Sequence, residues 1–370
     1  MRVTTLPDAC TADLVSQRRD HAVSFLASRG LDPGWLARVM HDHMGDGELL
    51  LTSSPVRGFA NATSDLDFIH IGEHALEGPR IATKIFEKGE HLEVIPFSAA
   101  QVHTALAGLR DLASCAIAET VAGYRGWDKR CEPRRKQVER IVNGLTLTWD
   151  APYLEWLPDL GTVWSRAALQ NAVEQAAYLA LAEAAGELRG RVGYAINTLL
   201  QLMDALMSSQ GDVCTTRKWC LLRWRRLTSG NTAGSERAAA VVHEVERLRK
   251  QVAAVLADPG AVHGMAREYL ALVSEVAGVT SAASQVRVRF VTGPGARQVP
   301  FLPGASMLVT ADQAVLLPGE GLRPADLAER TLAGLVDMGP EQAAPLLQAL
   351  RANAVQPRVT YGDSTGGADD

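Results

Sequence analysis

Residues 52–71 read TSSPVRGFANATSDLDFIHI, and this stretch decides the fold class of the chain. It overlaps the run ELLLT at residues 48–52, which is short and continuously apolar and therefore predicts a buried strand. Ser53 and Ser54 end that strand, and a loop of small residues turns the chain. The partial alternation in LDFIHI, residues 66–71, predicts a second strand that opens with a pair of aspartates.

The two aspartates, Asp65 and Asp67, lie two positions apart. Residues two apart in a strand project to the same side, so both carboxylates point one way while Leu66 faces the core. Such carboxylates repel each other unless a cation lies between them, and Mg²⁺ binds to one or two carboxylates plus phosphate oxygens. A third carboxylate is expected from Glu93 in the strand-like run HLEVIPF, residues 91–97. Three carboxylates on one sheet face can hold two Mg²⁺ ions for an in-line phosphoryl displacement.

Simpler interpretations exist for these and neighbouring residues. An Asp-x-Asp pair alone is also typical of solvated acids at the start of a strand. Glu90 competes with Glu93 for the role of third carboxylate, because strand register can slip by one residue. His41, His43 and His70 are conceivable metal ligands or bases, and a structural or surface role is the simpler interpretation for each of them.

The stretch resembles the signature of the DNA polymerase-beta-like nucleotidyltransferase superfamily. In that signature a strand ends in Gly-Ser, Arg-Gly commonly follows, and Ser-Asp-x-Asp comes next. Here Ser54 precedes Asp65 by 11 positions, residues 57–58 are Arg-Gly, and residues 64–67 read SDLD. The resemblance covers residues 47–97 and implies an α+β nucleotidyltransferase core, with a mixed sheet and helices, of the small-molecule or minimal type.

The resemblance also implies roles for individual residues. Asp65 and Asp67 would ligate both metal ions, and Glu93 would ligate one ion and help to deprotonate the acceptor hydroxyl. Ser54 would contact the triphosphate, and the neighbouring Ser53 would belong to the same nucleotide-binding turn. Ser53 stands where the family normally has glycine, a residue that lets the backbone approach phosphates closely and adopt unusual dihedral angles.

The pattern of apolar residues divides the chain into parts. Residues 1–110 mix helix and strand patterns and are expected to form the nucleotidyltransferase core. Residues 111–285 carry apolar residues at three- and four-residue spacing, which predicts a helical bundle domain. Residues 286–361 alternate again and predict a small α/β, winged-helix-like module, and residues 362–370 predict a disordered tail.

The individual elements follow from the same patterns. A turn is expected at residues 87–90 between two strands of a hairpin. The expected helices lie at residues 12–27, 33–41, 99–123, 129–143, 165–188, 190–208, 213–228, 234–256, 259–279, 324–335 and 340–352.

Two basic segments of the helical region are further candidates. Lys218 follows two threonines in CTTRKW, residues 214–219, and is expected in the first turn of a helix. A lysine there can reach a triphosphate, and a solvated basic cluster with its neighbouring arginines is the equal alternative. The segment EPRRKQVE, residues 132–139, predicts a charged helix face, with RNA binding as the alternative.

Composition limits the classes of function. The chain has 370 residues with 37 basic and 42 acidic side chains, a formal charge of −5, so bulk attraction to nucleic acid or an anionic membrane is not expected. The first residues lack a signal-peptide pattern, and no apolar run is long enough to span a bilayer. The five cysteines are scattered without a CxxC pair. We therefore expect a cytoplasmic protein.

These patterns and the resemblance together predict a metal-dependent nucleotidyltransferase. The expected reaction transfers a nucleoside monophosphate from an NTP, with ATP favoured, to a small-molecule or protein acceptor and releases pyrophosphate. Antibiotic modification or a step of natural-product biosynthesis is the expected setting. One alternative, favoured by Ser53, is a catalytically impaired nucleotide-binding or regulatory protein on the same fold. The other is an RNA-end nucleotidyltransferase.

Overall fold

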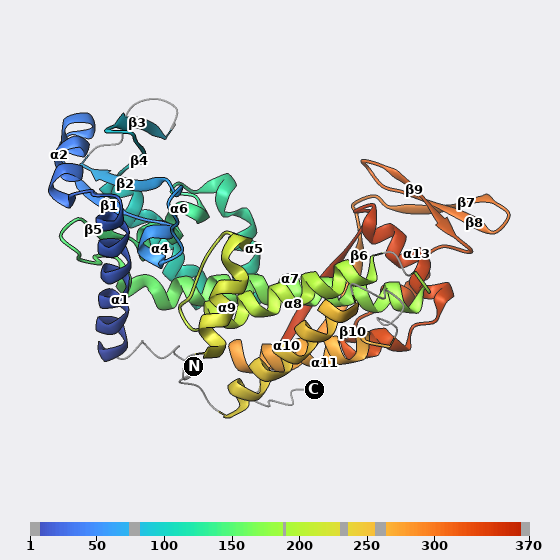
Figure 1. The fold of residues 1–370 in the computed structure, drawn as a ribbon. Helices are drawn as coiled ribbons and strands as arrows, with labels where there is room; N and C mark the ends of the chain where they lie inside the picture. The colour runs from blue at the N-terminus through green and yellow to red at the C-terminus, as the bar shows by residue number, and fades with distance from the viewer. Residues whose placement is uncertain (1–7, 74–81, 188–189, 230–235, 256–263, 364–370) are drawn as a thin grey trace. The chain divides into compact units, whose positions relative to one another are not determined.

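The computed structural model describes residues 8–73, 82–187, 190–229, 236–255 and 264–363, and the chain forms two compact units (Figure 1). The first unit comprises residues 1–164 and 208–219, and the second comprises residues 165–207 and 220–370. Two of the three boundaries fall inside long helices, α7 (Leu157–Ala184) and α8 (Arg191–Ser209), and the third lies between Trp219 and Cys220. The three-part division at residues 110 and 285 stays a prediction.

A five-stranded mixed sheet forms the centre of the first unit. Its strands lie in the order β3-β4-β2-β1-β5, with β2 and β4 parallel and every other neighbouring pair antiparallel. The α+β class is therefore confirmed. The strands are β1 (Glu48–Leu51), β2 (Leu66–Gly72), β3 (Thr83–Glu87), β4 (Glu90–Ser98) and β5 (Leu145–Thr146).

The predicted hairpin turn joins β3 and β4. Lys88 and Gly89 form it with φ angles of 52° and 83°. Two positive φ angles in a two-residue turn match the twist of the strands that the turn connects.

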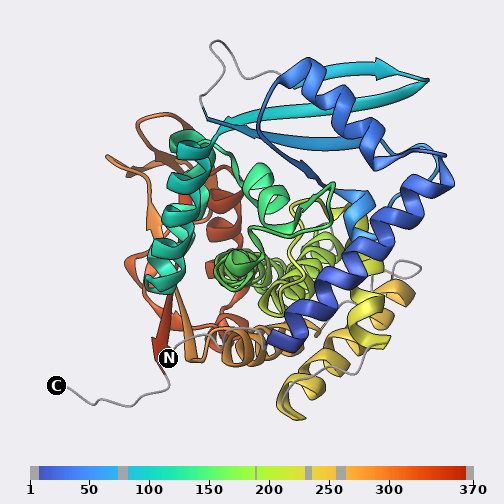
Figure 2. The ribbon, with the colours of Figure 1, turned by 90° about the vertical axis from the view of Figure 1, so that its left-hand side faces the viewer.

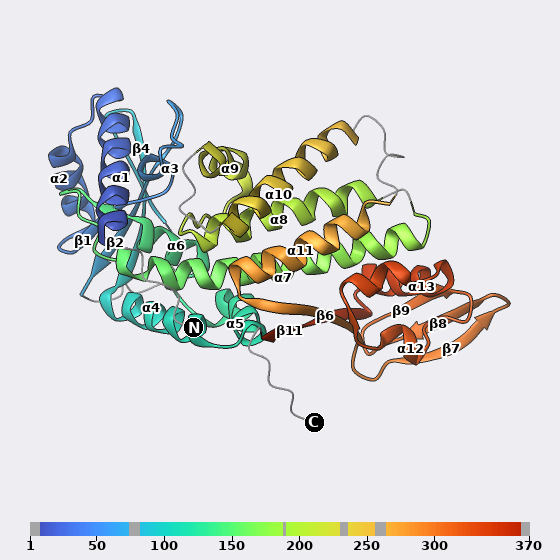
Figure 3. The same cartoon turned by 90° about the horizontal axis from the view of Figure 1, so that it is seen from below.

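Side chains of the sheet alternate between two cores. Figures 1 and 3 show the ribbons of the helices that contribute to these cores. Leu66 and Phe68 of β2 pack with α1 (Asp8–Ser28) and α2 (Pro33–Met44) on one face. Ile69 of β2 packs on the other face. The second core includes side chains of α4 (Ala99–Ser114), α5 (Ile117–Arg130) and α6 (Arg135–Asn143). The position of Asp67 between Leu66 and Phe68 therefore directs its side chain to the face covered by α4 and α6.

Figure 2 shows the sheet of the first unit with α1 and α2, in blue, along it. Sequence features of α2 explain where it begins: the carboxylate of Asp32 accepts a hydrogen bond from the backbone N–H of Trp35 at 2.7 Å, and proline is the first helical residue. Both features are favourable at a helix N-terminus.

The second unit combines helices with two small sheets. Its helices include α9 (Cys220–Ser229), α10 (Glu236–Val255), α11 (Ala266–Thr280), α12 (Pro324–Leu327) and α13 (Pro340–Arg351). The sheets have the orders β10-β6-β11 and β7-β8-β9. The strands are β6 (Ala283–Thr292), β7 (Arg297–Leu302), β8 (Ala305–Val309), β9 (Ala314–Pro318), β10 (Arg330–Thr331) and β11 (Val355–Asp363).

The likeness of this C-terminal part to a winged helix stays a prediction. Strand β11 continues to Asp363, two residues into the segment predicted as a disordered tail, and residues 364–370 lie outside the described residues. Within the described parts of the chain, no helix is long and apolar enough to cross a membrane.

Several predicted helices are wrong in extent. The helix expected at residues 129–143 begins at Arg135, and the helix expected at residues 213–228 begins at Cys220. The helix expected at residues 99–123 is two helices, α4 and α5, and the hydroxyl of Thr120 donates to the carbonyl of Leu112 across the break at 2.8 Å. The helix expected at residues 324–335 ends at Leu327, because the chain becomes extended and Arg330–Thr331 pairs with β6 as β10. Apolar side chains in residues 99–123 and 324–335 recur at helical spacing, but in residues 324–335 backbone pairing with β6 overrides that local pattern.

Candidate functional site

Asp67 and Glu93 lie side by side on neighbouring parallel strands. The register of β2 and β4 pairs Asp67 with Glu93, while Leu66 pairs with Leu92 and Phe68 with Val94. Strands in a sheet are about 4.8 Å apart, and paired residues project to the same face. Both side chains are half-buried. The sheet thus holds two carboxylates together on the face covered by α4 and α6.

The end of β1 connects these carboxylates with the turn that contains Ser53 and Ser54, here called the serine turn. The backbone N–H and the hydroxyl of Thr52 both donate to the backbone carbonyl of Asp67, at 2.9 and 3.0 Å. Ser53 therefore follows directly after the residue that is fixed to Asp67. A role of Ser53 and Ser54 in nucleotide binding stays a prediction.

Asp67 also has a cationic partner that the sequence did not indicate. The guanidinium of Arg140, on α6, donates to the carboxylate of Asp67 at 3.1 Å. Their side chains are 10% and 17% exposed, so solvent screens this ion pair only partly. Arg140 thereby reduces the repulsion between the carboxylates of Asp67 and Glu93.

Asp65 lies just before β2 and its carboxylate points to another neighbour. Its Oδ1 lies 3.2 Å from Nδ1 of His91, and 61% of the Asp65 side chain is exposed. His91 is the second residue of β4 and stacks on the ring of Phe86. The three predicted acids thus lie near the N-terminal ends of β2 and β4, but Asp65 and Asp67 have separate partners.

Glu90, the competitor for the third carboxylate, is already paired. Arg29 binds both carboxylate oxygens of Glu90 and also donates to the carbonyl of Ser64 at 2.6 Å. The side chains of Arg29 and Glu90 are 18% and 13% exposed. Glu90, through Arg29, therefore helps to hold the chain just before β2 in place, whereas Glu93 lies beside Asp67.

The donor set of Asp67 and Glu93 fits Mg²⁺. This ion is usually bound through one or two carboxylates together with phosphate oxygens and water. Within the described ranges, no group of three or more histidine, cysteine, aspartate or glutamate side chains converges as a metal site. Binding of Mg²⁺ at these carboxylates stays a prediction, and Asp65 would have to leave His91 to join the ligands.

The serine turn holds a strained backbone at one position. Ser53 has φ 64° and ψ −141°, a conformation that residues with a Cβ rarely adopt and that glycine adopts readily. Ser54 begins the short helix α3 (Ser54–Arg57), which the sequence did not predict, and Gly58 ends it with φ 65°. Ser53, which stands where the nucleotidyltransferase signature has glycine, thus has a glycine-like backbone.

A buried polar network fixes this turn to the rest of the first unit. Arg57, the last residue of α3, donates to Glu139 of α6 at 3.1 Å and also binds Asp212 and the carbonyl of Val213. Glu139 in turn accepts a bond from Thr215 at 3.3 Å. The serine turn, α6 and the segment 208–219 are therefore held by one set of charges.

A second buried arginine lies in this network. Arg18 of α1 is 4% exposed and donates to the side chain of Asn143. Burial, together with the nearby charge of Arg57, lowers the pKa of Arg18 to about 9, although the carboxylates of Asp212 and Glu139 raise it. The four elements that contribute to this network are distant in sequence, so no local pattern could have shown it.

The prediction of a charged helix face at residues 132–139 is only partly right. Glu139, its last residue, is buried and contacts Arg57, and Arg140, which follows the segment, is buried and contacts Asp67. Side chains at every position from 138 to 143 are buried, although apolar residues occupy only three of them. A helix that buries its charges is a signal for a polar site, because buried charges require partners.

Lys218 lies in a 3₁₀ turn, Arg217–Trp219, which directly precedes α9. Its side chain is exposed, and its ammonium lies 4.7 Å from the ring centroid of Trp219. Trp219 stacks on Phe59, just beyond α3, with ring centroids 5.5 Å apart. This contact brings the lysine's neighbour to the serine turn, and a role of Lys218 in triphosphate binding stays a prediction.

Comparison with known proteins gives a family without a known activity. A model of a family of unknown function (DUF6001) matches residues 10–361. No curated protein matches the chain.

Proposed function

We propose that this chain, which belongs to the family of unknown function DUF6001, is a metal-dependent nucleotidyltransferase. The observation that supports this most is the in-register pair of Asp67 and Glu93 beside the turn that contains Ser53 and Ser54. Two adjacent carboxylates next to a hydroxyl-bearing turn provide the oxygen ligands for an Mg²⁺–triphosphate complex. Asp65, at the start of the same strand, supplies the third carboxylate.

In the proposed reaction, a hydroxyl oxygen of a small-molecule or protein acceptor attacks the α-phosphorus of an NTP, with ATP favoured. A new phosphorus–oxygen bond forms, the bond from the α-phosphorus to the bridging oxygen breaks, and pyrophosphate leaves. The carboxylate of Glu93 accepts the proton of the acceptor hydroxyl. The hydroxyl of Ser54 donates a hydrogen bond to the triphosphate, and the ammonium of Lys218 attracts its charge.

Asp65, Asp67 and Glu93 would hold the Mg²⁺ ions, of which two are proposed. When bound, Mg²⁺ neutralises phosphate charge and polarises the reacting phosphoryl group. Arg140 orients the carboxylate of Asp67 through its hydrogen bond on the face at which the triphosphate would bind. Arg57 has a different role, because it holds the serine turn in place through Glu139.

The direct test is release of pyrophosphate from each of the four NTPs with Mg²⁺ and a panel of small-molecule acceptors. The variants Asp65→Asn and Asp67→Asn are expected to abolish the release. Asp20→Asn is the matched control, because Asp20 is an exposed acid (70%) on α1, whose core residues pack on the opposite face of the sheet. Activity within a few-fold of the native chain in both site variants would refute the proposal.

The backbone of Ser53 favours one second candidate, a nucleotide-binding protein that has lost catalysis. A serine with a glycine-like backbone puts a Cβ where close approach of phosphates is expected. This candidate predicts calorimetric binding of Mg²⁺–ATP without release of pyrophosphate, both in the native chain and in Ser53→Gly. Recovery of pyrophosphate release in Ser53→Gly would decide for an enzyme whose activity is reduced by the serine.

A further inference from the structure

Strand β6 of the second unit has an edge that is paired only along part of its length. On one side β11 pairs with the whole strand, from Ala283 to Thr292. On the other side β10 is only two residues long and pairs with residues 287–288. Among the described residues, no strand pairs with residues 289–292 on that side.

Alternation along β6 shows which backbone groups point to the open edge. The N–H of Leu332 donates to the carbonyl of Val286 on the β10 side at 3.0 Å. Backbone groups of successive residues point to opposite edges of a strand. The N–H and C=O groups of Phe290 and Thr292 therefore point to the open side, whereas those of Arg289 point to β11.

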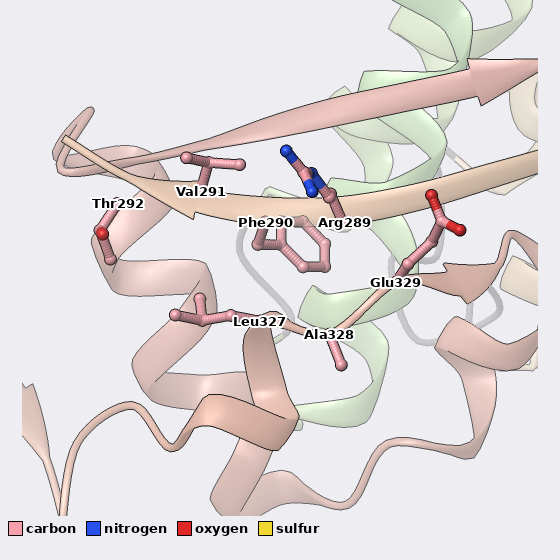
Figure 4. A pocket seen from close by; sticks show the side chains of 7 residues that line it. All are labelled: Arg289, Phe290, Val291, Thr292, Leu327, Ala328 and Glu329. Atoms are coloured by element: carbon pink, nitrogen blue, oxygen red, sulfur yellow. The ribbon is translucent and has the colours of Figure 1, made fainter.

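A hollow of about 470 Å³ lies along this edge and is lined by residues 289–292 and 327–329 (Figure 4). Figure 4 shows the ring of Phe290 on the side of β6 that faces Leu327 and Ala328, and the Arg289 guanidinium on the opposite side of the strand. The hollow forms because the chain that leads into β10 diverges from β6 before Arg330. It therefore combines unpaired backbone groups with an apolar wall.

Two arginines face each other beside the hollow. The register of β6 and β11 pairs Arg289 with Arg358, and both are exposed. Like charges directly opposite each other destabilise a sheet. Within the described part of the chain, neither arginine forms an ion pair.

The neighbouring arginine, Arg287, shows how a carboxylate can pair with a guanidinium on this face of the sheet. Arg287 lies 3.6 Å from the carboxylate of Glu329, which also accepts a hydrogen bond from Thr360 at 3.0 Å. Thr360 lies on β11 and is paired with Arg287 of β6. Two residues further along β6, the pair of Arg289 and Arg358 lacks an equivalent acid among the described residues.

We propose that the open edge of β6 at residues 289–292 binds an extended acidic peptide segment of a partner protein as an added antiparallel strand. The antiparallel direction follows from β10, which already pairs antiparallel on this edge. The backbone of the peptide pairs with Phe290 and Thr292. Its side chains alternate, with carboxylates beside Arg289 and Arg358 and apolar side chains beside Phe290 in the hollow.

Charge and shape favour a peptide over a nucleic acid. Nucleic acids bind to extended basic surfaces that contact many phosphates, whereas here two arginines lie in a chain of net charge −5. Four residues of open strand match a peptide of about four or five residues, since a strand rises about 3.4 Å per residue. The backbone groups at this edge that pair with no strand favour the addition of another strand.

The test uses the full chain and a fluorescein-labelled peptide, acetyl-Val-Glu-Val-Glu-Val-amide, whose binding is followed by fluorescence polarisation. Antiparallel addition pairs the valine amides with Phe290 and Thr292 and leaves the glutamate amides on the outer edge. N-methylation of the valines is therefore expected to weaken binding at least about tenfold, and N-methylation of the glutamates to change it less than about twofold. The two peptides have identical side chains and charge.

Variants of the chain test the charge requirement. The double variant Arg289→Glu/Arg358→Glu is expected to weaken binding of the glutamate peptide at least about tenfold and to bind the corresponding lysine peptide instead. Arg297→Glu, at an exposed arginine on β7, is the matched control and is expected to have no effect.

Three outcomes would overturn the proposal. The first is absence of saturable binding up to about 1 mM peptide, the concentration scale of weak association. The second is equal tolerance of both N-methylation patterns, which excludes strand addition even if the arginine variants fold poorly. The third is saturable competition by a ten-nucleotide oligothymidylate, which would assign the face to nucleic acid.

Discussion

Replacement of Ser53 by glycine is expected to stabilise the first unit. The φ of 64° and ψ of −141° at Ser53 lie in a region that costs a residue with a Cβ about 1–3 kcal/mol. Glycine removes this strain but loses about 0.5–1 kcal/mol more chain entropy on folding. The serine side chain forms no helix-capping hydrogen bond that would be lost. The net gain is therefore about 1 kcal/mol in the free energy of unfolding.

The measurement is differential scanning calorimetry of the native chain, Ser53→Gly and Ser54→Gly. A gain of about 1 kcal/mol corresponds to a rise of roughly 2–4 °C in Tm for a unit of this size. Ser54 is the matched control because it begins α3 and has no positive φ, so glycine there is expected to lower Tm. Equal destabilisation by both glycines would refute the strain at Ser53. Ser53→Gly is also expected to retain or tighten NTP binding.

Three further predictions concern single side chains. Asp67→Asn is expected to cost about 1–3 kcal/mol of stability, because Arg140 loses a poorly exposed charged partner, whereas exposed Asp65→Asn costs little; urea unfolding compares them. Lys218→Ala is expected to raise the Kd for Mg²⁺–ATP about tenfold without changing Tm, and calorimetry showing no change would assign the lysine to solvent. Burial lowers the pKa of His70, outweighing hydrogen bonds with the backbone of Gly45 and Asp46 that raise it. Below about pH 6.5 the unfolded chain therefore binds a proton at His70 more readily than the folded chain, and the free energy of unfolding falls. His70→Gln should flatten the decrease in urea midpoint between about pH 7 and 5.

Much of the local structure could be predicted because helices and strands have characteristic periods. The alternation at residues 66–71 and 91–97 predicted β2 and β4, and apolar spacing predicted most of the helices. The segment at residues 324–335 shows the limit of this approach. Its apolar spacing is compatible with a helix, but Arg330–Thr331 pairs with a strand about forty residues earlier, and that pairing is not visible locally.

The sequence by itself determined which residues are candidates for the chemistry: two aspartates at the start of a strand, a glutamate on a later strand, and two serines that follow the preceding strand. Only the tertiary structure decided that Glu93 rather than Glu90 lies beside Asp67, because the parallel register of β2 and β4 fixes this pair and Arg29 binds Glu90. It also decided that Arg140 contacts Asp67. Side-chain spacing within a strand follows from backbone geometry, whereas the partner of a buried charge depends on how separate elements pack together.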